Sequence, residues 1–181
     1  MTIFAQILGI FGLILTVISF QTKQQKVLIG IQFYSCMIFT VHFWLLGAAM
    51  GCILNAICIL RAFVFSRKDR IWAQWKGWPV VFIAAYCAAY ALNFLILGTE
   101  PTAFKLIIEL LPTLGIVVGT VGFAMKKAFH VRIACLICSP MWLVYNIING
   151  SVGGTLTEII SLISIVTGIL RLDLKRKDSV S

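Results

Sequence analysis

Long apolar runs separated by short basic segments leave this chain few folds to adopt. Most of the runs have about 16 to 20 residues, and a helix rising 1.5 Å per residue needs about 20 to cross a bilayer. There are seven of them: Ile3–Phe20, Val27–Leu46, Ala48–Phe65, Pro79–Leu97, Leu106–Met125, Ile133–Ile148 and Thr155–Leu172. None alternates polar and apolar residues as a barrel strand does. The sequence predicts an all-α polytopic membrane protein with seven transmembrane helices.

Composition excludes the common soluble classes of protein. Of the 181 residues, 61% are hydrophobic and 12% are charged, whereas a soluble domain carries about 25% charged residues. The mean hydropathy is +1.03, and a soluble fold of this size has too much surface to hide so many apolar side chains. A water-soluble enzyme, a nucleic-acid-binding module and a disordered chain are therefore excluded, and membrane lipids are the expected surroundings.

The basic residues distinguish the two sides of the predicted bundle. Lys105 lies on one side, and Arg61, inside the third span, is expected to extend toward the headgroups of the other. The remaining thirteen follow odd-numbered spans: Lys23, Lys26, Arg67, Lys68, Arg70, Lys76, Lys126, Lys127, Arg132, Arg171, Lys175, Arg176 and Lys177. An excess of Lys and Arg marks the cytoplasmic side. We therefore expect the N-terminus outside and the C-terminus in the cytoplasm, which an odd number of spans allows.

The linker after the third span is rich in tryptophan. Trp72, Trp75 and Trp78 recur every three residues beside Arg70 and Lys76. This pattern favours a helical turn that lies in the headgroup layer as an aromatic anchor. A ligand-binding aromatic cage is the alternative.

Neither a metal site nor a catalytic site is expected. The Cys135-x-x-Cys138 spacing has no second pair of ligands and lies in an apolar run, so the cysteines are interpreted as small packing residues rather than zinc ligands. The two histidines, His42 and His130, do not form a serine–histidine–acid set at a plausible depth. We expect no cofactor and no enzymatic activity.

A shift of 103 residues superimposes spans one to three on spans five to seven without a gap. Small residues then recur at matched spacing along one helix face of each set: Gly9, Gly12, Thr16 and Ser19, against Pro112, Gly115, Gly119 and Gly122. The fourth span has no counterpart. This predicts a 3+1+3 arrangement of two parallel repeats, with repeats at 1–66 and 104–172, a linker with its own helix at 67–103 and a basic tail at 173–181. The alternative is a seven-helix bundle with coincidental spacing.

The segment that ends the first span carries a family resemblance. Ser19, Phe20 and Lys26 match the Ser-Phe-x-Pro-Gln-x-x-Lys run of the MtN3, PQ-loop and SWEET group, although Thr22 and Lys23 stand in place of Pro-Gln. Phe43-Trp44-Leu45-Leu46-Gly47 resembles the end of that group's second helix. Overall, the chain is most similar to the bacterial inner-membrane protein family YgjV, which looks like a distant branch of the group. The resemblance implies a location in the bacterial inner membrane, a SWEET-like architecture, solute transport and a binding role for Asn55.

Polar residues within the spans are candidates for a solute pocket, because they are costly in lipid. In span six, Cys135, Ser139, Trp142, Asn146 and Asn149 share one face, with Tyr145 at its shoulder. The shifted face of span two carries Gln32, Cys36, Phe39, Phe43 and Leu46, with His42 at its shoulder. A polar face opposite an aromatic one suits an asymmetric cavity, and hydrogen bonding between helices is the alternative for Trp142, Asn146, Tyr145 and His42.

Asn55 and Glu158 occupy equivalent positions after the shift, within about two turns of the outer end. We take them as the polar floor of the pocket. The alternative is that Glu158 is a solvated residue near the start of span seven, beside Thr155 and Thr157.

Two functions follow from these observations. The first is a small-solute transporter with its pocket between the two triplets, in which one chain forms a complete pathway, so that a homo-oligomer is possible but not required. The second is a non-transport membrane protein such as a sensor, scaffold or assembly factor. No nucleic-acid partner is expected.

Overall fold

The computed structural model describes residues 2–95 and 100–174. All regular structure in these two ranges is helical: α1 (Thr2–Phe20), α2 (Gln25–Leu45), α3 (Ala49–Ser66), the 3-10 helix η1 (Ile71–Gln74), α4 (Trp78–Leu95), α5 (Ala103–Ala124), α6 (Ala128–Ile148), α7 (Val152–Gly168) and its π-helical continuation η2 (Ile169–Leu174). Seven helices are long and apolar enough to cross a membrane. The predicted all-α fold with seven spans is confirmed, and the predicted end of the fourth span at Leu97 lies outside the described residues.

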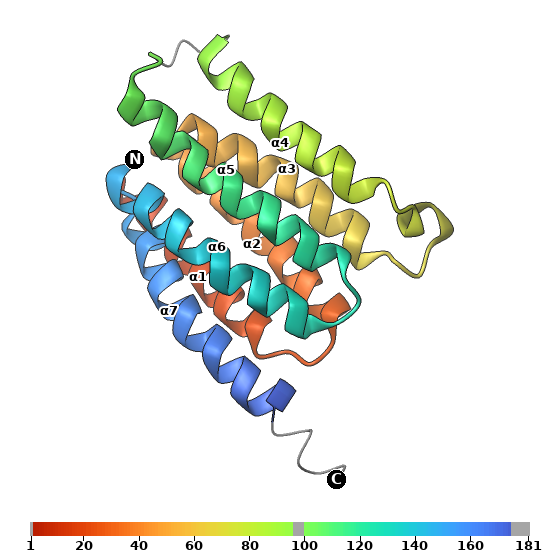
Figure 1. The fold of residues 1–181 in the computed structure, drawn as a ribbon. Coiled ribbons are helices and arrows are strands. Elements are labelled where there is room, and N and C mark those ends of the chain that lie inside the picture. Colours follow the sequence, from red (N-terminus) through yellow and green to blue (C-terminus); the bar gives the residue numbers. More distant parts are fainter. Residues whose placement is uncertain (1, 96–99, 175–181) are drawn as a thin grey trace.

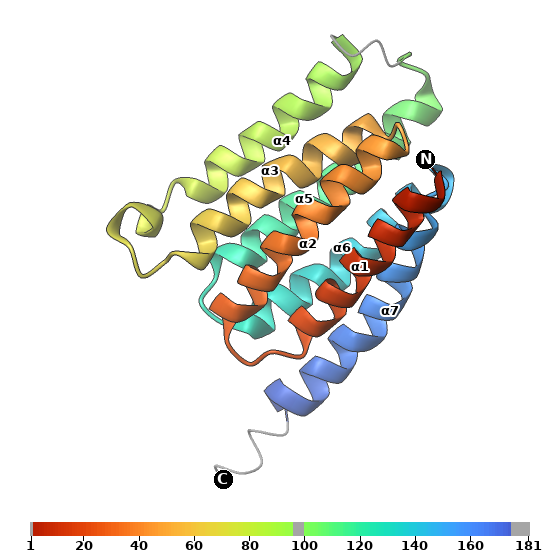
Figure 2. The ribbon, with the colours of Figure 1, turned by 180° about the vertical axis from the view of Figure 1, so that it is seen from behind.

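Six of the helices follow one another around a bundle, and α4 lies outside it. Along the ring, α1 packs on α2, α2 on α3, α5 on α6 and α6 on α7, while α1–α7 and α3–α5 contacts close the ring. Helix α4 packs against α3 and α5 from outside, at one edge of the bundle in Figures 1 and 2. The start of α1 and the end of η2 lie at opposite ends of the bundle (Figure 1).

Glycines bring α1 close to its two neighbours. A Cβ on Gly9 would lie 2.9 Å from the Cα of Gly153 in α7, and one on Gly12 would lie 2.7 Å from the ring of Phe39 in α2. Helix association in lipid depends on such close packing, because the hydrophobic effect does not drive it there. The small-residue stripe of the first span is therefore a contact surface.

The turns after α2 and α6 have the same construction at positions 103 apart. Gly47 and Gly150 adopt positive φ angles of 72° and 64°, which glycine accepts without strain. In the next position, the backbone N–H of Ala48 donates to Phe43 and that of Ser151 to Asn146, over 3.0 and 2.9 Å. Both turns therefore end a helix with the glycine-dependent motif that satisfies its last carbonyls.

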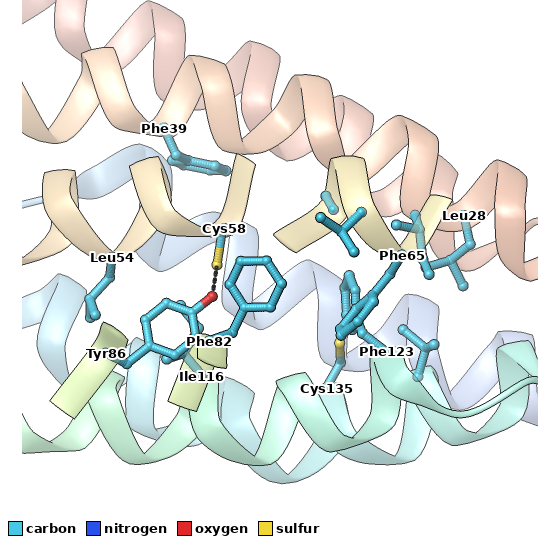
Figure 3. Close-up of a cluster of buried hydrophobic side chains, with 14 of the residues drawn as sticks. Leu28, Phe39, Leu54, Cys58, Phe65, Phe82, Tyr86, Ile116, Phe123 and Cys135 are labelled. Atoms are coloured by element: carbon cyan, nitrogen blue, oxygen red, sulfur yellow. Dashed lines mark hydrogen bonds between the residues drawn. The ribbon is translucent and has the colours of Figure 1, made fainter. Parts of the chain in front are cut away.

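An apolar core anchors α4 to the ring. Phe82 and Tyr86 of α4 reach toward α3, where the ring centroid of Phe82 lies 5.7 Å from that of Phe65, and the Tyr86 hydroxyl lies 3.5 Å from the Cys58 sulfur (Figure 3). Elsewhere the surface is lined by exposed apolar side chains such as those of Leu60 and Ile163. Such a surface suits a lipid environment.

The tryptophan-rich linker forms the expected helical turn, η1. The indole N–H of Trp78 donates to the Trp72 carbonyl over 2.9 Å, and Trp72 stacks on Phe63 of α3 with ring centroids 6.0 Å apart. These contacts fold the linker onto the end of the bundle.

Arg132 requires a correction to the sequence analysis, which placed it in the loop between the fifth and sixth spans. Helix α6 begins at Ala128, so Arg132 lies inside it and is fully buried. Its Nε donates to the Phe20 carbonyl over 3.0 Å, its Nη1 pairs with Asp173 at 2.7 Å, and Nη2 donates to the Thr22 carbonyl. The helix extends upstream because these partners satisfy the guanidinium inside the bundle.

Candidate functional site

A cavity of about 130 Å³ lies inside the ring of six helices. Helices α1, α2, α3, α5, α6 and α7 all contribute side chains to its wall, whereas the described residues of α4 contribute none. The cavity therefore lies between a first unit, α1–α3, and a second unit, α5–α7.

Most of the cavity wall consists of residues paired by the 103-residue shift. Nine pairs account for 18 of the 22 lining residues: Thr16/Gly119, Phe20/Phe123, Gln32/Cys135, Ser35/Cys138, Cys36/Ser139, Phe39/Trp142, Phe43/Asn146, Asn55/Glu158 and Cys58/Ser161. The four lining residues without such a mate are Arg61, Ile116, Gly154 and Thr157. The two units thus present equivalent helix faces to one space, with different chemistry on each.

Four of the six predicted site residues line this cavity: Asn55, Glu158, Trp142 and Asn146. The predicted polar face of α6 and aromatic face of α2 both point into it, apart from Asn149 and Leu46 at the C-terminal ends of these helices. His42 and Tyr145, which the sequence placed at the shoulders of these faces, do not line it.

One part of the cavity combines an aromatic wall with amide and carboxylate groups. The ring centroids of Phe43 and Trp142 lie 6.0 Å apart. Asn55 Nδ2 donates to the carbonyl of Gly51 over 2.9 Å, and Glu158 of α7 lines the same wall. Asn55 and Glu158, which the 103-residue shift pairs, therefore both line the wall, one neutral and one acidic.

Three buried polar atoms of the wall form no hydrogen bond with the residues that the structure describes. They are Asn146 Oδ1, Ser161 Oγ and Arg61 Nε, and all three are inaccessible to solvent. A buried polar atom without a partner costs free energy. The fold therefore leaves polar groups of this wall unsatisfied.

His42 and Tyr145 hold helix ends together. The Gly51 backbone N–H donates to the Tyr145 hydroxyl over 2.8 Å. His42 Nδ1 lies 2.6 Å from the Ala5 carbonyl, and its Nε2 lies 2.7 Å from the Ser151 hydroxyl. Because a carbonyl only accepts, Nδ1 carries the proton, and the Ser151 hydroxyl then donates to Nε2. Both side chains are fully buried in these contacts.

Arg61 is the lining residue that the sequence analysis misplaced, because it does not extend to the headgroups. Only 5% of it is exposed. Its Nη1 donates to the Thr120 hydroxyl over 2.9 Å and to the Ile116 carbonyl over 3.3 Å, and its guanidinium carbon lies 4.2 Å from the centroid of the Phe123 ring. A Cβ on Gly119 would lie 3.5 Å from Nη1. The small residue of α5 thus leaves room for the guanidinium.

One feature of the sequence agrees with the inward direction of the Arg61 side chain. Arg61 precedes the last residue of α3, Ser66, by five positions, which is about 7.5 Å along a helix axis. At that depth, an arginine is as able to turn inward as outward when a small residue faces it. Gly119 belongs to the predicted stripe of small residues in α5 and is the small residue that faces Arg61.

The cysteines do not form a metal site in the described part of the chain. Cys36, Cys58, Cys135 and Cys138 line the cavity. No three His, Cys, Asp or Glu side chains among the described residues are placed to hold a metal ion together.

Comparison with known proteins identifies relatives along nearly the whole chain. The model of the family Imp-YgjV, described as bacterial inner membrane protein, matches residues 3–176. The chain is 28% identical over 158 residues to a protein of Escherichia coli (strain K12) called inner membrane protein YgjV, an alignment that covers 85% of this chain and 76% of that protein. No solved structure matches the chain.

Proposed function

This chain belongs to the Imp-YgjV family of bacterial inner membrane proteins, and from that premise we propose that it carries a small solute across the inner membrane. Its site is the cavity between the two units, with Asn55, Glu158, Trp142 and Asn146 as solute-binding residues. A transporter opens its binding site alternately to the two sides of the membrane. This requires a site that lies between two units that move relative to one another. The observation that carries the proposal is the wall of this cavity, to which both units contribute equivalent positions.

The proposed architecture is a 3+1+3 arrangement of parallel repeats, similar to that of SWEET transporters, with α4 as the linker helix. Three features support it: the nine lining pairs, the matched turns at Gly47 and Gly150, and the closure of the ring by α1–α7 and α3–α5. In this proposal, an axis along the membrane normal relates the two units. We further propose that the N-terminus faces outward and the C-terminus the cytoplasm, since the loops at the C-terminal end of the bundle carry the basic residues.

Uptake into proteoliposomes tests the transport function. We expect saturable uptake of one class among sugars, amino acids, nucleosides, organic cations and organic acids. Ser161→Leu, which fills the cavity, should abolish that uptake, whereas Thr167→Leu on the same helix replaces a hydroxyl outside the cavity and should preserve it. A folded protein that moves none of these classes would contradict the proposal.

The second candidate is a non-transport membrane protein, and one observation favours it. Buried Arg132 ties the end of α1, the start of α6 and η2 together through Phe20, Thr22 and Asp173, and such a cluster resists opening at that end. We propose no catalytic activity for either candidate.

A further inference from the structure

The proposed transport cavity contains a buried cation that has no carboxylate partner among the described residues. Arg61 lines the cavity and is 95% removed from solvent by the surrounding helices. No carboxylate among the described residues lies within 4.0 Å of its guanidinium. Glu158, the acidic residue of the same wall, forms no ion pair with Arg61. An uncompensated charge at this depth is costly and calls for a partner of opposite sign.

One hydrogen-bonding edge of the Arg61 guanidinium has no partner among the described residues. Nη1 donates to Thr120 and Ile116, and the ring of Phe123 covers one face of the plane. Nε is buried without a partner, and no hydrogen bond of Nη2 to the described residues is formed. Nε and Nη2 together form the edge of the guanidinium that matches the two oxygens of a carboxylate.

The rest of the wall suits a small polar molecule. Ser161, on the opposite unit, and Asn146 each have a polar atom without a partner, and the free space amounts to about 130 Å³. A carboxylate carries one negative charge and balances one guanidinium, whereas a phosphate dianion would leave an excess charge inside the span.

We propose that this cavity binds a small organic monocarboxylate, with its carboxylate on the Nε–Nη2 edge of Arg61. The inference deepens the proposed function and rests on the same cavity, since it assigns the class of solute. Thr120 and Phe123 act as positioning residues that orient the guanidinium, and Ser161 and Asn146 receive the polar groups at the other end of the solute.

Calorimetric titration of the full chain in phosphatidylcholine nanodiscs tests this assignment. The probes are acetate, propionate and lactate, with lactamide as the uncharged isostere of lactate and inorganic phosphate as the competing anion. Wild-type protein should bind at least one carboxylate, and lactate at least about tenfold more tightly than lactamide, because the charge-assisted pair is absent with the amide. Equal affinity for lactate and lactamide, tighter binding of phosphate, or no binding of any carboxylate would overturn the proposal.

Variants then locate the binding group. Arg61→Gln should weaken carboxylate binding at least about tenfold, and Arg61→Lys should weaken it too, because lysine keeps the charge but lacks the two-donor edge. Arg67→Gln removes an exposed arginine of the same chain segment and should leave the affinity unchanged. Unchanged affinity in folded Arg61→Gln overturns the assignment. If Arg61→Gln does not fold, the lactate and lactamide comparison on wild-type protein decides the proposal.

Binding and flux are measured separately, so the two proposals fail separately. Carboxylate binding in nanodiscs without uptake into proteoliposomes contradicts the transport function and supports the assignment of the site. Uptake of sugars or cations only, without carboxylate binding, supports transport and overturns the assignment.

Discussion

His42 and Tyr145, 103 positions apart, reach across the bundle to the first turn of a helix in the opposite unit. Tyr145 of α6 accepts the Gly51 N–H of α3 over 2.8 Å. His42 of α2 meets Ser151, whose hydroxyl accepts the Gly154 N–H of α7 over 3.1 Å. A helix start has N–H groups without partners within the helix. Tyr145 caps the third helix of the opposite unit directly, and His42 contacts Ser151, the N-cap residue of the third helix opposite it.

Loss of the Tyr145 hydroxyl should therefore destabilise the contact between the units. In Tyr145→Phe, the buried Gly51 N–H has no acceptor, and we expect a loss of about 1 to 3 kcal/mol in unfolding free energy. Tyr34→Phe provides the control, because Tyr34 is 61% exposed. Thermal unfolding in detergent measures the stability of both variants. Equal stability of the two would show that the hydrogen bond to the Tyr145 hydroxyl does not stabilise the fold.

The small-residue stripes should not accept large side chains. A Cβ on Gly12 would lie 2.7 Å from Phe39, and one on Gly115 would lie 3.1 Å from the Cys138 Cβ, so Gly12→Leu and Gly115→Leu should each lose about 1 to 3 kcal/mol or fail to fold. Ile14→Leu and Val121→Leu alter exposed positions on the same helices and should be mild. Four variants of equal thermal stability would contradict a packing role for the stripes.

Arg132 should be the most sensitive basic residue of the chain. Arg132→Gln leaves Asp173 without its partner, together with two helix-end carbonyls, and we expect a loss of about 3 to 5 kcal/mol, typical of a broken buried pair. Asp173→Asn should cost less, because the contacts of Arg132 to Phe20 and Thr22 persist.

The matched control for Arg132 is Arg171→Gln, which removes an exposed arginine of η2. Melting temperatures of the three variants should rank Arg171→Gln highest and Arg132→Gln lowest. If the order of melting temperatures were reversed, Arg132 would not stabilise the fold in the way we propose.

Glu158 and Asn55 are predicted to contribute to transport rather than to folding. Once a transported solute is identified, Glu158→Gln should lose transport or its pH dependence while the melting temperature stays near that of wild type, because the change keeps the volume of the side chain and removes its charge. Asn55→Ala should weaken solute binding in parallel. Transport with an unaltered pH profile in Glu158→Gln would exclude that carboxylate from the pathway.

Topology is predicted from charge and can be mapped with reporter fusions. Fusions after Lys127 and after Ser181 should report a cytoplasmic location, and one after Gly98 an external one, because Lys and Arg are retained on the cytoplasmic side. An external signal at Ser181 together with a cytoplasmic one at Gly98 would invert the proposed orientation.

The sequence by itself determined the number of helices and the faces that meet at the cavity. Lengths of apolar runs set the seven spans, since the bilayer has one thickness. The period of 3.6 residues per turn placed Ser139, Trp142 and Asn146 on one face of α6, and the 103-residue shift paired that face with the lining face of α2.

Only the tertiary structure decided where the long and branched polar side chains point. The pattern of one helix specifies a face relative to its own axis, whereas the direction of a flexible side chain depends on the space and partners that another helix offers. Arg61 turns inward because Gly119 and Thr120 of α5 leave room and an acceptor, and Arg132 is buried because carbonyls at the end of α1 and Asp173 converge on it. These partners are distant in sequence, so no local pattern contains them.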